Sequence, residues 1–210
     1  MTENSEAILT GADPAEVWPL VRDHHYSGRM PGSIQRCYAL REPGGLFGDT
    51  GEVIAAIVFS SPPTRWSEPV LELSRLVRVP GCDFPLTKLI SGACKYLKIN
   101  GYDLAVSFAD WTQNHHGGIY QAASWNFTGK RDRANDGVLV DGVFIPGRSC
   151  NAKWGTRSPE KLKSRLTGHS VEAHYDEGKF LYWRALSKAE KKKADRLGLE
   201  CLPYPKPRTA

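Results

Sequence analysis

The stretch DHHYSGRMP, residues 23–31, combines two adjacent histidines with a tyrosine, side chains that can exchange protons. An imidazole gains or loses a proton near neutral pH, and a phenol can donate a hydrogen bond or a proton. Adjacent side chains point in different directions, so one of His24 and His25 could face a site beside Tyr26 while the other faces water. The alternative is a polar turn at the solvated end of a helix.

Three other side chains could take part in chemistry, and each has a structural alternative. Arg75 lies inside an apolar strand pattern, where its guanidinium could bind an anion or lie on the polar face of the strand. Asp110 ends another apolar run, so it could act as a general base or cap the next helix. Tyr120 could be catalytic, or it could be a packed aromatic residue whose hydroxyl is satisfied.

A metal site is a weaker prediction from the same residues. His115 and His116 are adjacent, and two neighbours rarely bind one ion alone. Imidazole, phenol and carboxylate groups from residues 24–26, Asp110 and Tyr120 could bind iron, although no ligand spacing specifies it. The sequence has no P-loop, GxGxxG, GxSxG or paired CxxC pattern, which argues against kinases, Rossmann dehydrogenases, α/β-hydrolases and zinc ribbons.

The elements that must position these residues form an α/β (α+β) pattern. Asp13, Pro14 and Glu16 predict a capped helix start, and this helix would carry residues 23–31 at its C-terminal end. A helix over 85–101 separates two apolar strands, which implies a parallel strand pair with a crossover helix. We therefore expect a mixed central sheet flanked by helices, with strands at 36–40, 52–60, 70–79, 103–110, 125–130 and 179–186, a hairpin at 138–146 around Asp141-Gly142, and helices at 115–125, 158–166 and 187–198.

Length and composition fit one domain over residues 1–186, followed by a basic helix and a flexible tail over 187–210. A chain of 210 residues can bury a sizeable core. No apolar run is long enough to cross a bilayer, and the N-terminus lacks a signal-peptide pattern, so we expect a cytoplasmic protein without a membrane partner. The five cysteines are odd in number and irregularly spaced, which predicts free thiols.

The positive charge is concentrated in the last third of the chain. The formal net charge is +5, and residues 148–210 carry 15 basic and 7 acidic side chains. A basic surface of this kind favours a polyanionic partner, of which nucleic acid is the commonest. The alternative is a solvated basic tail that keeps the protein soluble.

Four segments, in this order, give the sequence a resemblance to a known family: HHYSGRMP, LELSRLVRV, VSFADWTQNHHGGIYQAASWNFTGK and KFLYWRAL. Together they resemble, from residue 15 to residue 186, the Mom DNA-modification proteins of Mu-like phages, a divergent branch of the GNAT acyltransferase fold. The resemblance implies an enzyme that converts adenine in double-stranded DNA to N6-(carbamoylmethyl)adenine. It also implies that the modified phage DNA is protected from host restriction, and that the enzyme works in the host-cell cytoplasm.

The resemblance implies roles for individual residues as well. The essential positions of the family fall on the residues singled out above: His25, Tyr26, Arg75, Asp110 and Tyr120. His25 and Tyr26 would then face the chemistry, and His24 would face solvent. Asp110, directly or through His25, would remove a proton from the adenine amine, and the two tyrosines would donate hydrogen bonds or protons to the donor. Arg75 would hold an anionic part of the donor or orient Asp110.

A target amine inside a duplex implies base flipping and a surface for phosphates. A flipped base could stack on Trp111, Trp125 or Phe127, although each of them also suits a core position. The expected phosphate contacts come from the basic C-terminal third: Lys153, Arg157, Lys161, Lys163 and Arg165.

The expected cofactor site departs from the usual GNAT pattern. An ordinary GNAT enzyme carries an Arg/Gln-x-x-Gly-x-Gly/Ala loop after its fourth strand, whereas this chain reads VPGCDFPLTKLISGACK there. Backbone amides at the start of helix 85–101 could still bind phosphate, with Arg78, Thr87 and Lys88 beside them. The expected donor is acetyl-CoA or another acyl donor, and an aminoacyl donor or a metal-assisted reaction is the alternative.

Two other functions fit the same sequence. A GNAT-type N-acyltransferase acting on a small amine or a protein lysine would need no DNA. A catalytically inactive DNA-binding protein would keep its biological effect after the substitution Asp110→Ala.

Overall fold

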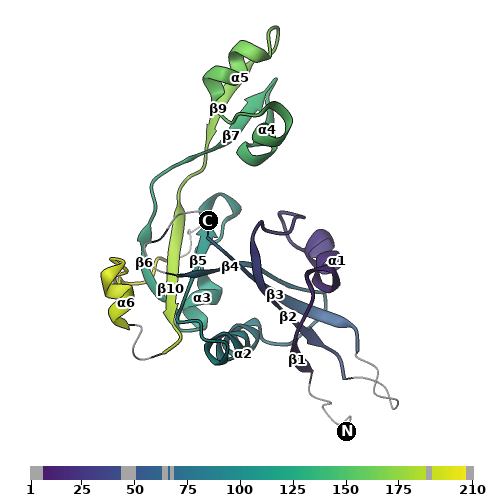
Figure 1. Cartoon of the computed structure of the whole chain (residues 1–210), viewed down its shortest axis with the longest axis vertical. Coiled ribbons are helices and arrows are strands. Elements are labelled where there is room, and N and C mark those ends of the chain that lie inside the picture. Colours follow the sequence, from purple (N-terminus) through teal and green to yellow (C-terminus); the bar gives the residue numbers. More distant parts are fainter. Residues whose placement is uncertain (1–6, 44–50, 63–65, 67–68, 188–190, 207–210) are drawn as a thin grey trace. The chain divides into compact units, whose positions relative to one another are not determined.

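The computed structural model describes residues 7–43, 51–62, 66, 69–187 and 191–206, and Figure 1 shows how the helices and strands follow one another. In chain order the helices and strands are β1 (Ile8–Gly11), α1 (Pro14–His24), β2 (Ile34–Arg41), β3 (Val53–Ser60), β4 (Leu71–Arg78), α2 (Leu86–Ile99), β5 (Leu104–Asp110), the 3₁₀-helix η1 (Trp111–Gln113), α3 (Gly118–Ala122), β6 (Asn126–Lys130), β7 (Asn135–Val140), β8 (Val143–Pro146), α4 (Gly147–Trp154), α5 (Pro159–Arg165), β9 (Val171–Tyr175), β10 (Lys179–Ala185) and α6 (Lys191–Arg196).

The central sheet has seven strands in the order β1-β2-β3-β4-β5-β10-β6. Its first four strands pair antiparallel, whereas β4 and β5 pair parallel with α2 as the crossover between them. This arrangement follows from chain direction, because a parallel pair needs a long connection, which here is a helix. The predicted mixed sheet flanked by helices, including the parallel pair, is confirmed.

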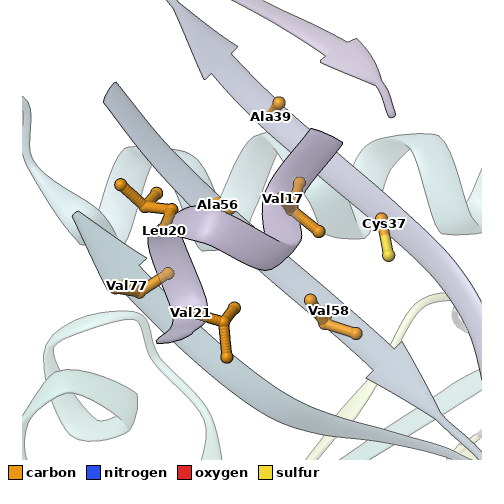
Figure 2. Packing of buried hydrophobic residues seen from close by; sticks show 8 residues of the cluster. All are labelled: Val17, Leu20, Val21, Cys37, Ala39, Ala56, Val58 and Val77. Carbon is orange, nitrogen blue, oxygen red and sulfur yellow. The ribbon is translucent and has the colours of Figure 1, made fainter. Parts of the chain in front are cut away.

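Helix α1 covers one face of the sheet and brings its C-terminal end to the candidate site. Asp13 caps the helix by accepting from the backbone N–H of Ala15 at 2.8 Å, and Glu16 completes the capping box by accepting from the N–H of Asp13 at 2.7 Å. Figure 2 shows the apolar side of α1 turned toward alternate residues of β2, β3 and β4. The cluster consists of Val17, Leu20, Val21, Cys37, Ala39, Ala56, Val58 and Val77.

The opposite face of the same strands is also buried, so the sheet is a middle layer with a helix on each face. Tyr38, between the α1-facing residues Cys37 and Ala39, is 4% exposed and stacks on Tyr96 of α2 with ring centroids 5.6 Å apart. Because successive strand side chains point to opposite faces, α2 must lie across the sheet from α1. The near-continuous apolar run of β3 reflects this two-sided burial.

Strand β4 contains an irregularity that opens the sheet next to the candidate site. Val58 of β3 pairs with Arg75, but Phe59 pairs with Leu73, so Ser74 is an extra residue in the ladder. On its other side, β4 pairs with β5 only through Leu71 with Ala105 and Glu72 with Val106, within the described strands. Both strands continue beyond these pairs, so they diverge toward their carboxyl ends, where parallel sheets hold ligands.

The chain divides into two compact units. Unit 1 contains the described residues of Met1–Phe108, Gly117–Gly129 and Leu181–Lys206, and unit 2 contains Ala109–His116 and Lys130–Phe180. Residues 191–206, which the sequence assigned to a separate helix and tail, contribute to unit 1. Ala194 of α6 is fully buried with Leu104 and Trp183, and Leu202 pairs with Phe127 of β6.

Unit 2 has its own small sheet and core. Its three strands are ordered β8-β7-β9, and α4 and α5 contribute to a cluster of Val138, Cys150, Leu162 and Val171. The hairpin around Asp141-Gly142 and the Ser158-capped helix were predicted from the sequence and are confirmed. Strands β1 and β9 and helix α4 were not predicted, because each is short and lacks a regular apolar pattern.

The cysteine prediction is confirmed, since all five cysteines are free thiols. Burial raises the pKa of Cys37 and Cys94 to about 11, so these two thiols are inert at neutral pH. In the part of the chain that the structure describes, no helix is both long and apolar enough to cross a bilayer.

Candidate active site

The loop after α1 folds back on itself and fixes the imidazole of His25. The backbone N–H of Ser27 donates to Nδ1 of His25 at 3.1 Å, and the Ser27 hydroxyl lies 2.8 Å from the same nitrogen. A nitrogen that accepts from an amide carries no proton, so the neutral ring holds its proton on Nε2. His25 therefore presents a hydrogen-bond donor at its other nitrogen. The Tyr26 ring lies beside it, with centroids 4.4 Å apart, and is 60% exposed.

Arg75 fastens this loop to the bulged strand. Its Nε donates to the carbonyl of Arg29 at 2.7 Å, and its Nη1 donates to the carbonyl of Ser74 at 2.6 Å. The hydroxyl of Ser74 also lies 2.5 Å from that of Ser60, which pins the bulge to β3. Two donor groups of the guanidinium thus bind backbone carbonyls. The bond to Arg29 makes the side chain a clamp that attaches residues 25–29 to β4. The expected binding of a donor anion by Arg75 stays a prediction.

Tyr120 lies on α3, whose start depends on a glycine. Gly117 has a φ of +84°, and a Cβ at this position would lie 2.2 Å from the Tyr182 ring. The missing side chain lets α3 approach β10, and the Tyr120 ring then packs 5.3 Å from Tyr182 and 5.6 Å from Trp125. The structure therefore explains Gly117 as a packing requirement.

The phenol of Tyr120 keeps its proton at neutral pH. Burial raises its pKa to about 12, against a smaller lowering by a hydrogen bond with Ser107, and Tyr26 and Glu72 raise it further. These causes show that Tyr120 lies near Tyr26 and near the point where β4 and β5 part. Ser107 is fully buried there and donates to the carbonyl of Leu73 at 2.8 Å, replacing a ladder hydrogen bond that the diverging strands cannot make.

Asp110 ends β5 and belongs to unit 2. Its Oδ1 accepts from the backbone N–H of Thr112 at 3.0 Å and from the Thr112 hydroxyl at 2.5 Å, and its Oδ2 lies 3.6 Å from Nζ of Lys179. The carboxylate therefore caps η1, which was the structural alternative to a catalytic role. One oxygen carries both cap contacts, and the other carries the ion pair.

Burial decides between base stacking and a core position for two of the neighbouring aromatic residues. Trp125 is fully buried and Phe127 is 7% exposed, so neither presents a face on which a flipped base could stack. Trp111 packs edge-on against Phe180, with ring centroids 4.8 Å apart. The described residues also contain no group of three or more His, Cys, Asp or Glu side chains placed to hold an ion, so the iron interpretation finds no support.

The residues expected to hold the donor gather at the start of α2. Arg78, at the end of β4, donates to the carbonyl of Phe84 at 3.3 Å and so spans the connecting loop. Thr87 and Lys88 lie in the first turn of α2. That turn has no acidic residue, and its N-cap, Pro85, makes no side-chain cap, a setting that suits an anion.

The five basic residues expected to contact phosphate are all exposed and lie on or between α4 and α5 of unit 2. Arg165 has a structural contact, because its Nη1 donates to the carbonyl of Trp154 near the end of α4. The ammonium of Lys153 lies 4.7 Å from the centre of the Trp154 ring. Arg165 thus ties the two helices together, while Arg157, Lys161 and Lys163 extend the exposed basic surface.

Sequence reasoning missed Ser27, Ser74 and Ser107, which orient the selected residues. Only Ser107 had a readable signal, a hydroxyl inside the apolar run LAVSFAD, since a buried hydroxyl needs a partner. Glu72 was also missed. It lies on β4 opposite Ser60 and Val106, near enough to Tyr120 to influence its pKa.

Comparison with known proteins places the chain in one family. The Mom protein family matches residues 8–206. No curated protein sequence matches significantly.

Solved structures with a distant likeness include a GNAT family N-acetyltransferase (YhbS) from Escherichia coli in complex with CoA, at 12% identity and a TM-score of 0.49, covering 89% of this chain and 85% of that one. The ribosomal-protein-S18-alanine N-acetyltransferase from Escherichia coli matches at 8% identity and a TM-score of 0.49, with coverages of 87% and 95%. Spermidine/spermine N-acetyltransferase SpeG from Vibrio cholerae, in complex with manganese ions, matches at 10% identity and a TM-score of 0.49, with coverages of 91% and 99%.

Proposed function

Because the chain belongs to the Mom protein family, we propose that it modifies the exocyclic amine of adenine in double-stranded DNA to give N6-(carbamoylmethyl)adenine. The observation that carries the proposal is the pair of His25 and Tyr26 rings, 4.4 Å apart, on a loop that Arg75 attaches to the bulged strand β4 where it diverges from β5. The modified phage DNA would resist host restriction, and the reaction would take place in the host-cell cytoplasm.

The proposed reaction requires a base and hydrogen-bond donors. The amine of adenine is a weak nucleophile because its lone pair is delocalised into the ring, and bond formation at N6 releases a proton. Tyr120 holds its proton at neutral pH, and His25 offers Nε2–H, so both suit the stabilisation of negative charge on a donor carbonyl. Asp110 is the proposed base. Its Oδ1 is held by the cap of η1, so Oδ2, which lies 3.6 Å from Nζ of Lys179, would take the proton.

The donor is proposed to be acetyl-CoA or another acyl or aminoacyl compound. Transfer of its acyl group to N6 would release the thiol or alcohol of the donor and first give an N6-acyl adenine. The carbamoylmethyl product also contains one further nitrogen and joins N6 through a methylene, so a donor such as an aminoacyl compound must bring that nitrogen and a rearrangement must follow. A phosphate of such a donor would bind at the start of α2, where the first turn lacks both an acidic residue and a side-chain cap. Arg78, Thr87 and Lys88 would hold it. Duplex DNA would bind through Lys153, Arg157, Lys161 and Lys163, with Arg165 holding α5 against α4.

The test is nucleoside mass spectrometry of plasmid DNA from bacteria that express the protein. Wild type should yield a deoxyadenosine heavier by the carbamoylmethyl group. Tyr120→Phe should lower its amount by about 100-fold or more, because it removes one donor from a charge-stabilising site. Tyr96→Phe is the matched control, since the Tyr96 hydroxyl donates to the carbonyl of Leu9 at 3.2 Å on another part of the sheet.

Asp110→Ala separates the proposal from its two rivals. Loss of the heavier nucleoside in this variant supports a base, whereas protection from restriction that survives it would indicate a non-catalytic DNA-binding protein. Unmodified DNA from folded wild-type protein, together with acylation of a small amine or of lysine, would replace the proposal by an N-acyltransferase that needs no DNA.

A further inference from the structure

The tip of the β7–β8 hairpin in unit 2 is held rigidly by the loop that precedes β9. Asp141 has a φ of +50° and Gly142 a φ of +80°, the backbone of a tight hairpin turn. Asp141 accepts from the backbone N–H of Ser170 at 2.9 Å and lies 2.6 Å from Nδ1 of His169. Its own N–H donates to the carbonyl of Ser170 at 3.0 Å. These contacts hold the pKa of Asp141 below its usual value, mainly through His169. The Asp141 carboxylate is therefore charged at neutral pH and keeps its contacts with His169 and Ser170.

The two residues after this turn are apolar and exposed. Val143 is 65% exposed and Phe144 is 42% exposed, on β8, which is an edge of the small sheet. Successive strand residues point to opposite faces, so the two side chains lie on either side of the ribbon. Val143 pairs with Val140, which packs toward the core of unit 2, whereas Phe144 lies on the other face.

The Phe144 ring is fixed in place rather than left to move freely. A Cβ on Gly137 would lie 2.3 Å from the carbonyl oxygen of Ile145 and 2.8 Å from the Phe144 ring, so the glycine makes room for both. His174 lies against the same ring, with centroids 4.5 Å apart, and Asp136 holds His174 at 2.6 Å. The ring is thus packed on Gly137 and His174 and still 42% exposed, which leaves an apolar surface that a partner could cover.

The segment that follows this hairpin in the chain is rich in basic residues. Residues 147–168, which contain α4 and α5, carry six basic side chains and one acidic side chain. Helix α5 ends at Arg165, four residues before the His169 that holds the turn. Figure 1 shows α5 beside β7 and β9 in unit 2. An exposed apolar ribbon tip beside a lysine-rich helix is complementary to a duplex, whose groove admits a two-stranded ribbon while its phosphates take the lysines.

We propose that the β7–β8 hairpin enters a groove of duplex DNA, with Val143 and Phe144 against the bases and Lys161 and Lys163 on the flanking phosphates. The inference rests on the proposed function, in which duplex DNA is the substrate. Apolar side chains set between or against base steps unstack them and bend the duplex. The hairpin would thereby lower the cost of turning the target adenine out of the helix.

The test uses the full chain and a fluorescent 25-base-pair duplex with 2-aminopurine in place of one adenine. The double variant Val143→Ser with Phe144→Ser should weaken binding about tenfold or more, because two partly exposed apolar side chains no longer become buried. Its dependence on salt should equal that of wild type, since no phosphate contact is lost. The rise in 2-aminopurine fluorescence on binding should disappear.

Two further variants separate phosphate contacts from apolar contacts and provide a control. Lys161→Gln with Lys163→Gln should make the negative slope of log affinity against log salt shallower by about 1.8, at about 0.9 for each phosphate contact. Ile99→Ser, at a position 78% exposed on α2 of unit 1, should bind DNA as wild type does.

The outcomes distinguish failure of the inference from failure of the proposed function. If wild type modifies plasmid DNA and the hairpin double variant, folded by circular dichroism, binds and unstacks the duplex like wild type, the hairpin proposal is wrong and the proposed function stands. The single variant Val143→Ser leaves the contact of Phe144 with Gly137 unchanged. If this variant also binds the duplex like wild type, the hairpin proposal is again wrong and the proposed function stands. If wild type neither binds duplex nor modifies it, both proposals fail.

Discussion

Replacement of Arg75 by methionine tests whether this side chain holds the His25–Tyr26 loop or touches the reactants. Methionine keeps much of the length and loses every donor, so the 2.7 Å bond to the carbonyl of Arg29 disappears. A hydrogen bond from a charged donor contributes about 1.5–3 kcal/mol, and the partly exposed position of this bond favours the lower value, about 1.5 kcal/mol. Because about 1.4 kcal/mol changes an equilibrium tenfold, the loop should be detached about ten times more often.

Limited proteolysis with trypsin measures this detachment without any knowledge of the substrate. The bond after Arg29 lies inside the clamped loop, so the peptide ending at Arg29 should appear about tenfold faster from Arg75→Met than from wild type. Arg78→Met is the matched control for cleavage, because Arg78 lies on the same strand and donates to Phe84 instead of to the loop. Its rate of cleavage after Arg29 should equal that of wild type.

Adenine modification in the same variants completes the experiment. A clamp predicts that Arg75→Met lowers modification by about the same tenfold as the loss of the attached loop. Cleavage at the wild-type rate together with loss of all modification would refute the clamp, and it would assign Arg75 to direct contact with the donor or the DNA.

The remaining predictions concern stability. Gly117→Ala should lower the free energy of unfolding by about 3 kcal/mol, because its Cβ would meet the Tyr182 ring at 2.2 Å in addition to the strain of a positive φ. Gly101→Ala, with a φ of +78° and open space around it, should lose only about 1 kcal/mol in the same urea titration. Burial raises the pKa of Tyr38 and Tyr120 to about 12, so the stability contributed by their neutral forms is complete below about pH 10 and falls as the pH rises through 12. Tyr120→Phe should reduce the steepness of this alkaline loss in thermal melts, and an unchanged pH profile would contradict the raised pKa of Tyr120.

The sequence predicted most elements of unit 1 because their signals are local. The Asp13-Pro14-Ala15-Glu16 cap fixed the start of α1, and alternating or continuous apolar runs marked β3, β4 and β5. The resemblance placed His25, Tyr26, Arg75, Asp110 and Tyr120 among the candidates, and the structure brings Tyr26 near Tyr120 and attaches the loop to β4 through Arg75.

What the sequence determined by itself is the set of elements and the identity of the polar side chains, since helix caps, apolar periods and turn residues act over a few neighbouring positions. Only the tertiary structure decided what those side chains do. The direction of the Ser27 amide sets the tautomer of His25, the bulge at Ser74 supplies one of the carbonyls held by Arg75, and burial beside Trp125 keeps the proton on Tyr120. The bond from Arg75 to the carbonyl of Arg29 and the packing of Tyr120 against Tyr182 join residues far apart in the chain, which no local pattern records.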